Sequence, residues 1–123
     1  MNDPCPERCL IVDDNPAFCD KARSVLEADG IEVVGLASSL RDAVAAARSA
    51  RPDLALVDID LGAESGFDVI EALHAEPGPL ALVLMSTHDE LEFADLIEAS
   101  PALGFVPKFA FSAELIRQLV ASR

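Results

Sequence analysis

The chain has 123 residues, of which 51% are hydrophobic, and its formal net charge is −13 at pH 7. This length predicts one folded domain over residues 1–123, and no apolar run approaches the roughly 20 residues that a membrane span needs. The acidic balance disfavours binding to a phosphate backbone, which needs lysine and arginine, so we expect no direct nucleic-acid contact. The first residues, MNDPCPERC, lack the features of a secretory signal, which favours a cytoplasmic protein.

The three cysteines, an odd number, do not make a disulfide framework. Cys5 and Cys9 lie close in sequence, but the two histidines are far from them, and a zinc site needs four good ligands. We therefore expect reduced thiols, with Cys9 inside a strand.

Apolar runs alternate with amphipathic stretches along the chain, without a repeat or a linker. The apolar runs predict strands at 9–13, 31–37, 54–58, 80–85 and 103–107. Capping residues mark the helix starts, namely Asn15 before Pro16, Ser39, Ser65 or Gly66, Thr87 in a capping box with Glu90, and Ser112. The first four helices are expected to end at Gly30, at Ala50, at Pro77-Gly78 and before Pro101.

Strands that are apolar on both faces and separated by helices indicate a parallel sheet covered on each side. We therefore predict a doubly wound α/β fold of five βα units with strand order 2-1-3-4-5. In such sheets ligands bind beyond the carboxyl ends of the strands, where the strand order reverses. Strands one and three flank this point in the predicted order.

The residues at these strand ends share a polar or charged character, and they are Asp13, Asp14, Asp58, Ser86, Thr87 and Lys108. Three neighbouring carboxylates repel one another and call for a divalent cation, and an oxygen-lined site that leaves room for water suits Mg²⁺. A cation beside an ammonium and a hydroxyl would attract a phosphoryl group. Aspartate is a known phosphoryl acceptor, so Asp58 is a candidate nucleophile.

Four segments, IVDDNP, PDLALVDIDLGAESG, LVLMS and GFVPK, follow one another in this order. With these segments the chain resembles the response-regulator receiver domain of two-component signalling, over essentially its whole length. The resemblance implies a flavodoxin-like fold and a signalling domain rather than an enzyme. GFVPK is most similar to receivers that usually precede a helix-turn-helix DNA-binding domain.

The resemblance also implies a role for each matching position. Asp58 would accept a phosphoryl group from a histidine kinase or a histidine phosphotransfer protein and would later lose it by self-dephosphorylation. Mg²⁺ would be held by Asp14 directly, by Asp13 mainly through water, by Asp58 and by the backbone carbonyl of Asp60. Ser86 would be the switch hydroxyl, Lys108 would pair with a phosphoryl oxygen, and Phe105 would be the aromatic that changes rotamer.

Alternative interpretations stay open. Asp13 and Asp14 could be turn residues, Thr87 rivals Ser86 as the hydroxyl, and Phe105 could be a core aromatic. Asp58-Ile59-Asp60 also matches the start of haloacid-dehalogenase-type phosphatases, although that motif usually lies on their first strand. A scaffold that never binds phosphate would be expected to have lost an acidic or lysine position.

The sequence departs from the usual receiver pattern in the loops around the site. Gly62 stands where the family often has proline, which predicts a more flexible loop. Phe109 stands where a proline in a cis peptide often follows the lysine. Asp60 and His88 occupy positions that line the path of attacking water, so the lifetime of the aspartyl phosphate does not follow from relatives.

The fourth predicted helix has more apolar side chains than one buried stripe needs, namely Leu91, Phe93, Ala94, Leu96 and Ile97. Phe93 and Leu96 are predicted to lie beside the stripe, and Phe109 and Phe111 could extend the same surface. A contiguous apolar patch usually marks a contact site. The resemblance places partner binding or homodimerisation on the face of helix four, strand five and helix five.

Overall fold

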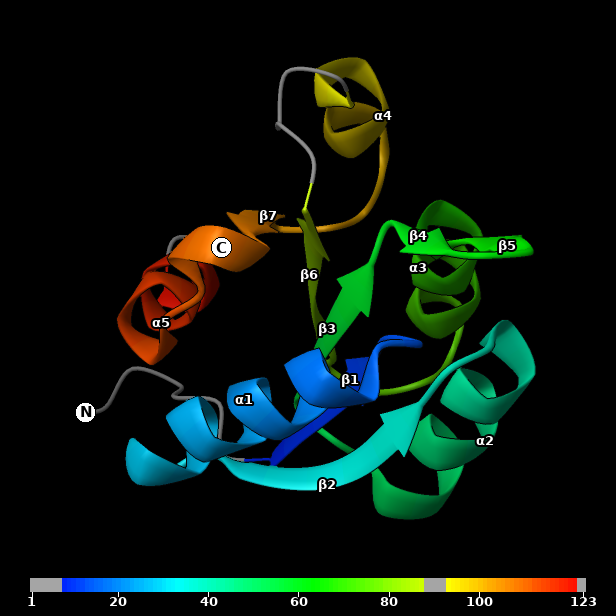
Figure 1. The fold of residues 1–123 in the computed structure, drawn as a ribbon. Coiled ribbons are helices and arrows are strands. Elements are labelled where there is room, and N and C mark those ends of the chain that lie inside the picture. Colours follow the sequence, from blue (N-terminus) through cyan, green and yellow to red (C-terminus); the bar gives the residue numbers. More distant parts are fainter. Residues whose placement is uncertain (1–7, 88–92, 122–123) are drawn as a thin grey trace.

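The computed structural model describes residues 8–87 and 93–121 of the chain (Figure 1). Its larger sheet contains β1 (Arg8–Val12), β2 (Glu32–Ala37), β3 (Leu54–Asp58), β6 (Ala81–Ser86) and β7 (Gly104–Pro107). The helices are α1 (Pro16–Ala28), α2 (Leu40–Ala50), α3 (Gly66–His74), α4 (Ala94–Ala99) and α5 (Ala113–Ala121). A small hairpin joins β4 (Asp60–Leu61) to β5 (Glu64–Ser65), and a 3₁₀ turn, η2 (Lys108–Ala110), follows β7.

The larger sheet is parallel, with the order β2-β1-β3-β6-β7. Counted over the predicted strands alone, this is the predicted order 2-1-3-4-5, and the α/β fold is confirmed. The labels differ because the β4–β5 hairpin, which the sequence pattern did not predict, lies between β3 and α3. The order reverses at β1 and β3, so the carboxyl ends of these neighbouring strands flank the switch point.

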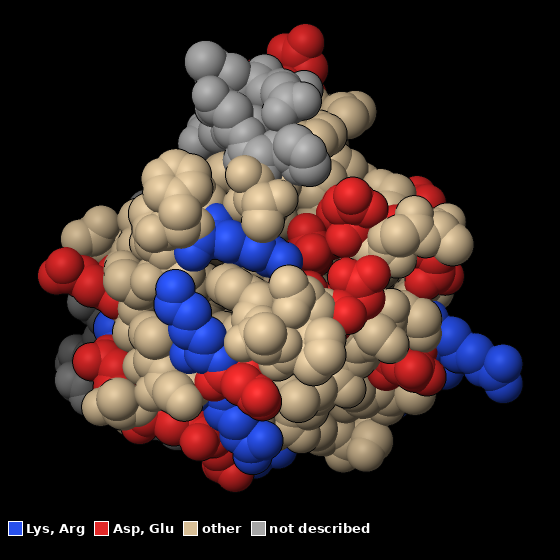
Figure 2. All heavy atoms as spheres, viewed as in Figure 1, with Lys and Arg blue, Asp and Glu red and all other residues tan. Residues whose placement is uncertain are grey.

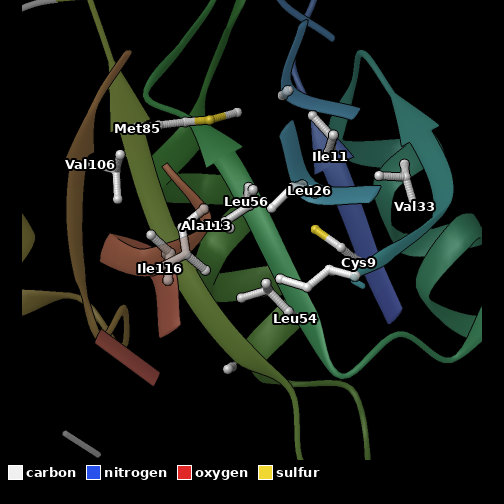
Figure 3. Packing of buried hydrophobic residues seen from close by; sticks show 14 of the residues in the cluster. Cys9, Ile11, Leu26, Val33, Leu54, Leu56, Met85, Val106, Ala113 and Ile116 are labelled. Atoms are coloured by element: carbon white, nitrogen blue, oxygen red, sulfur yellow. The ribbon is translucent and has the colours of Figure 1, made fainter. Parts of the chain in front are cut away.

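Alternate side chains of each buried strand pack on opposite faces of the sheet. On one face, strand residues such as Ile11 and Leu56 pack with Leu26 of α1 and Ile116 of α5 (Figure 3). The other face packs mainly against α2 and α3. A sheet that is covered on both faces has its strand ends as the open region for a ligand.

The predicted caps are present at four helices. Asn15 Oδ1 accepts the N–H of Ala17 and of Phe18 at the start of α1. The hydroxyls of Ser39, Ser65 and Ser112 accept main-chain N–H groups at the starts of α2, α3 and α5. Because Asn15 begins α1 two residues after Asp13, this cap also fixes the segment that leads out of the acidic strand end.

The structure corrects the predicted apolar patch. Phe93 is half-buried, and its ring lies 6.3 Å from that of Phe67. Phe111 is also half-buried. By contrast, Leu96 is 55% exposed and Phe109 is 82% exposed, so these two residues remain in the surface hypothesis. The predicted contributions of Leu91, His88 and the Glu90 cap lie outside the described residues.

Two further expectations can be compared with the described residues. The third helix ends at His74, before the predicted Pro77-Gly78. None of the helices in 8–87 and 93–121 is both long enough and apolar enough to cross a membrane.

Candidate functional site

Three carboxylates meet at the carboxyl ends of β1 and β3, as the sequence predicted. Asp13 and Asp14 follow β1, Asp58 ends β3, and one oxygen from each lies within 4.8 Å of the others. Asp13 and Asp58 are 4% and 6% exposed, whereas Asp14 is exposed. Figure 2 shows acidic atoms gathered beside basic atoms in the part of the view where β3 ends in Figure 1. Two buried carboxylates at this spacing need a compensating cation.

Lys108 supplies part of that compensation. Its Nζ lies 2.6 Å from Oδ2 of Asp13 and 3.0 Å from Oδ2 of Asp58. Lys108 begins the turn after β7 and is 8% exposed, so its side chain is buried in the site. The ammonium therefore joins the two acids that end neighbouring strands.

Main-chain groups hold the remaining carboxylate oxygens. The Asn15 N–H donates to Asp13 Oδ1 at 2.9 Å, and the Asp60 N–H donates to Asp58 Oδ1 at 3.1 Å. Ile59, which lies between Asp58 and Asp60 in the sequence, donates its N–H to the carbonyl of Met85 on β6 at 2.9 Å. Asp58 is thus held by the backbone on one oxygen and by Lys108 on the other.

The loop after Asp58 folds back against the strand end as the β4–β5 hairpin. Gly62 has φ +77°, which favours glycine, and its N–H donates to Asp60 Oδ1 at 3.0 Å. Glu64 Oε1 accepts the N–H of Leu40 at 2.8 Å. At Gly66, a Cβ would lie 2.0 Å from the carbonyl oxygen of Asp58, so α3 begins where a side chain has no room.

The charges at the site shift two pKa values. Burial raises the pKa of Asp58, although the Lys108 and Asp60 hydrogen bonds act in the opposite direction. Burial alone would lower the pKa of Lys108, but its contacts with Asp13 and Asp58 outweigh burial and raise this pKa. Two carboxylates stabilise the charged form of Lys108. Asp58 has only this one ammonium, which it shares with Asp13, and the negative charge of Asp13 disfavours the charged form of Asp58. Lys108 therefore stays an ammonium at neutral pH.

The donor set fits a hard divalent cation. Lys108 Nζ lies 2.6 Å from Oδ2 of Asp13 and 3.0 Å from Oδ2 of Asp58, but one ammonium offsets only part of the charge of three neighbouring carboxylates. Carboxylate oxygens are the ligands that Mg²⁺ prefers, and exposed Asp14 leaves room for the waters that this ion keeps. A cavity of about 350 Å³ opens beside Asp13, Asp14 and Pro16. The acidic end of the sheet is thus accessible from solution.

The other predicted residues lie as follows. Ser86 is buried at the end of β6, next to Met85, which is the register partner of Asp58, whereas Thr87 is exposed. Phe105 is buried on β7 opposite Leu84. The roles of Ser86, of Phe105 and of the Asp60 carbonyl remain predictions.

Sequence reasoning missed one residue at the site. The ring of Phe18 lies under the ammonium of Lys108, 4.5 Å from Nζ to the ring centroid. Phe18 lies in the helix predicted between Asn15 and Gly30, but the sequence pattern did not place it at the site. Its position beside the acidic strand end, at the third residue of α1, is the one signal that could have indicated this contact.

A sequence model described as the response regulator receiver domain matches residues 9–120. A putative transcriptional regulator of Pseudomonas aeruginosa is 33% identical over 109 residues, which are 89% of this chain and 53% of that protein. The BvgA regulator of Bordetella pertussis, a putative positive transcription regulator of virulence factors, is 31% identical over 109 residues, which are 89% of this chain and 52% of that protein. The chain spans about half the length of these curated relatives.

Solved receiver structures share the fold. The signal receiver domain of the putative response regulator NarL from Mycobacterium tuberculosis is 25% identical and has a TM-score of 0.84, covering 98% of this chain and 100% of that chain. A LuxR-family two-component response regulator from Aurantimonas sp. also gives a TM-score of 0.84 at 26% identity, covering 96% of this chain and 87% of that chain.

A flavodoxin-like sheet with an acidic cluster and a buried lysine at its switch point defines a class of phosphate-handling signalling domains. Within that class, this chain belongs to the receiver domains of two-component response regulators. Receiver domains of this family are phosphorylated and bind Mg²⁺ at an acidic cluster, and they work with histidine kinases or phosphotransfer proteins.

Proposed function

We propose that residues 1–123 form one receiver domain whose phosphoacceptor is Asp58. The donor is a histidine kinase or a histidine phosphotransfer protein. Mg²⁺ is held by Asp13, Asp14, Asp58 and the backbone carbonyl of Asp60. The observation that carries the proposal is the buried carboxylate of Asp58, placed within 4.8 Å of two other acids and 3.0 Å from Lys108 Nζ.

The chemistry follows from these contacts. One Asp58 oxygen forms a bond to phosphorus while the bond between phosphorus and the donor breaks, and with acetyl phosphate the leaving group is acetate. The Asp60 N–H and Lys108 orient the carboxylate, as their 3.1 and 3.0 Å contacts support. The bound cation supplies charge neutralisation for the transferred group, and positioning with neutralisation is most of what phosphoryl transfer requires.

Phosphorylation then changes the charge of a buried site. A phosphoryl group adds roughly −1.5 to −2 charge. Lys108 is an ammonium that already contacts Asp58, so it is in place to pair with a phosphoryl oxygen on that residue. Ser86 donates a hydrogen bond from its hydroxyl to the same phosphoryl group. Phe105, buried on neighbouring β7, relays the change by altering its rotamer. The domain acts as a switch rather than as an enzyme with an external substrate.

The output of the switch is a change in protein contacts. Two relatives are named as putative transcriptional regulators and are about twice as long as this chain, which supports control of a helix-turn-helix output domain. Exposed Leu96 on α4 and Phe109 after β7 support a contact with a second copy or a partner on the face of α4, β7 and α5. We assign the domain to the cytoplasm, where the unpaired thiols of Cys9 and Cys19 stay reduced.

Acetyl phosphate labelling tests the phosphoacceptor. The parent chain with Mg²⁺ should gain one phosphoryl mass that strong acid and strong base both remove, as expected of an acyl phosphate, and EDTA should prevent the gain. Asp58→Asn should abolish labelling, while Asp68→Asn, a matched change at an exposed aspartate of α3, should not. Labelling of Asp58→Asn at the parent rate, or equal labelling in EDTA, would contradict the proposal.

A further inference from the structure

We propose that Phe18 is a positioning residue for Lys108, holding the ammonium by its aromatic face between Asp13 and Asp58. The inference extends the proposed function, in which Lys108 receives the phosphoryl charge. Phe18 acts through the lysine rather than on the phosphoryl group.

The contact geometry is that of a cation–π interaction. Lys108 Nζ lies 4.5 Å from the ring centroid, inside the distance of about 6 Å at which a ring face attracts an ammonium. The same nitrogen meets Asp13 Oδ2 at 2.6 Å and Asp58 Oδ2 at 3.0 Å. Because the lysine side chain is only 9% exposed, water screens the ring less than it would at the surface.

The ring is fixed to the segment that carries Asp13. The Phe18 N–H donates to Asn15 Oδ1 at 3.2 Å, and the Asn15 N–H donates to Asp13 Oδ1 at 2.9 Å. The ring also meets that of Phe111 edge-on, with centroids 5.3 Å apart and an angle of 88° between the planes. The ring therefore keeps a set position relative to the acid that Lys108 contacts.

A fixed ring matters because a lysine side chain is long and loses much rotamer freedom when it is ordered. Two carboxylates draw its ammonium, and the transferred phosphoryl group must compete with them for the same charge. The ring face stabilises the ammonium at one place within reach of both acids. An aliphatic residue would fill the same space without attracting the charge.

Phe18→Leu separates the aromatic face from simple packing. The first readout is NMR of the Lys108 side-chain protons without Mg²⁺ or phosphate donor, so it does not depend on the proposed function. The parent should show upfield shifts from the ring, and Phe18→Leu should lose them. With acetyl phosphate and Mg²⁺, Phe18→Leu should then label Asp58 about two- to fivefold more slowly.

Two other variants make the test specific. Phe18→Tyr keeps the ring and should restore both the upfield shifts and the labelling rate. Phe67→Leu makes the same change at a half-buried ring that pairs with Phe93, and it should alter neither readout. If Phe18→Leu does not fold, Phe18→Met replaces it.

The inference is overturned if the aliphatic variant labels at the parent rate, if Phe18→Tyr does not restore the rate, or if the parent shows no ring shift at Lys108. Failure of the parent to label at all contradicts the proposed function instead, and the ring shift then decides separately whether Phe18 contacts the lysine.

Discussion

Replacing Lys108 by methionine should destabilise the fold in the absence of divalent cations. The change keeps an unbranched apolar stem but removes the ammonium that Asp13 and Asp58 share. The variant leaves Asp13 and Asp58 with oxygens within 4.8 Å of each other, and two unit charges at that separation repel by roughly 3.5 kcal/mol at an effective dielectric constant of about 20. Lys108 offsets this repulsion in the parent, and removing one partner of a buried ion pair costs about 3–5 kcal/mol. We expect the free energy of unfolding to fall by about 3 kcal/mol.

Urea unfolding followed by circular dichroism measures this loss. With a slope of about 1–3 kcal/mol per molar urea for a small protein, the midpoint should fall by roughly 1–3 M in EDTA. Millimolar Mg²⁺ should then stabilise Lys108→Met more than the parent, because the lysine no longer competes for the same carboxylates. Lys21→Met removes an exposed lysine from α1 and controls for the change in net charge.

Two results would refute this reasoning. One is a midpoint for Lys108→Met in EDTA that equals the midpoint of Lys21→Met, which would mean that the buried ammonium adds no stability. The other is an equal gain from Mg²⁺ in the parent and in Lys108→Met, which would mean that the lysine and the cation do not share carboxylates.

Three further predictions concern the same region and the core. Burial raises the pKa of Asp58 above 3.8, which means that the folded state favours the protonated form of this carboxyl. The stability that protonated Asp58 contributes is complete below pH 3.8 and is lost as the pH rises through the folded-state pKa. Asp58→Asn should therefore be more stable than the parent at pH 7 in EDTA, and denaturant unfolding should show this margin vanish in acid. Gly66→Ala should lower the free energy of unfolding by about 1–3 kcal/mol, because its Cβ would meet backbone atoms, and thermal unfolding should show this loss. Gly35→Ala should lose less, because its Cβ would meet only side-chain carbons, the nearest at 3.2 Å. Burial and the charge of Asp53 raise the pKa of the Cys9 thiol, so thiol reagents should modify it only after unfolding, as mass spectrometry would detect.

The sequence predicted the parts of the fold that depend on local chemistry. The strands were predicted from apolar runs, which are typical of strands buried on both faces of a sheet. The structure places each strand within one or two residues of its predicted position. Capping side chains act on N–H groups two or three residues away, so Asn15, Ser39, Ser65 and Ser112 were identifiable from sequence. The acidic cluster followed because the carboxyl ends of parallel neighbours share one edge of the sheet.

Features that depend on packing between distant segments were not predictable in this way. The two strands of the β4–β5 hairpin are only two residues each, too short for an alternating pattern to indicate. Phe18 lies in a helix that the sequence predicted, but the contact of its ring with Lys108 depends on where the turn after β7 lies. Phe93 was expected to be exposed but is half-buried, because its ring lies beside that of Phe67, which belongs to another helix. A contact between distant segments of this kind leaves no local pattern in the sequence.

The proposed contact face of α4, β7 and α5 predicts that its exposed apolar residues control self-association. Leu96 on α4 and Phe109 after β7 are 55% and 82% exposed, and α4 contacts β7. Sedimentation velocity with beryllofluoride and Mg²⁺ should show a change in self-association, since burying apolar side chains favours contact at about 25 cal/mol per Å². The double variant Leu96→Ser and Phe109→Ser should abolish that change. Association that persists in the double variant would place the contact elsewhere on the domain.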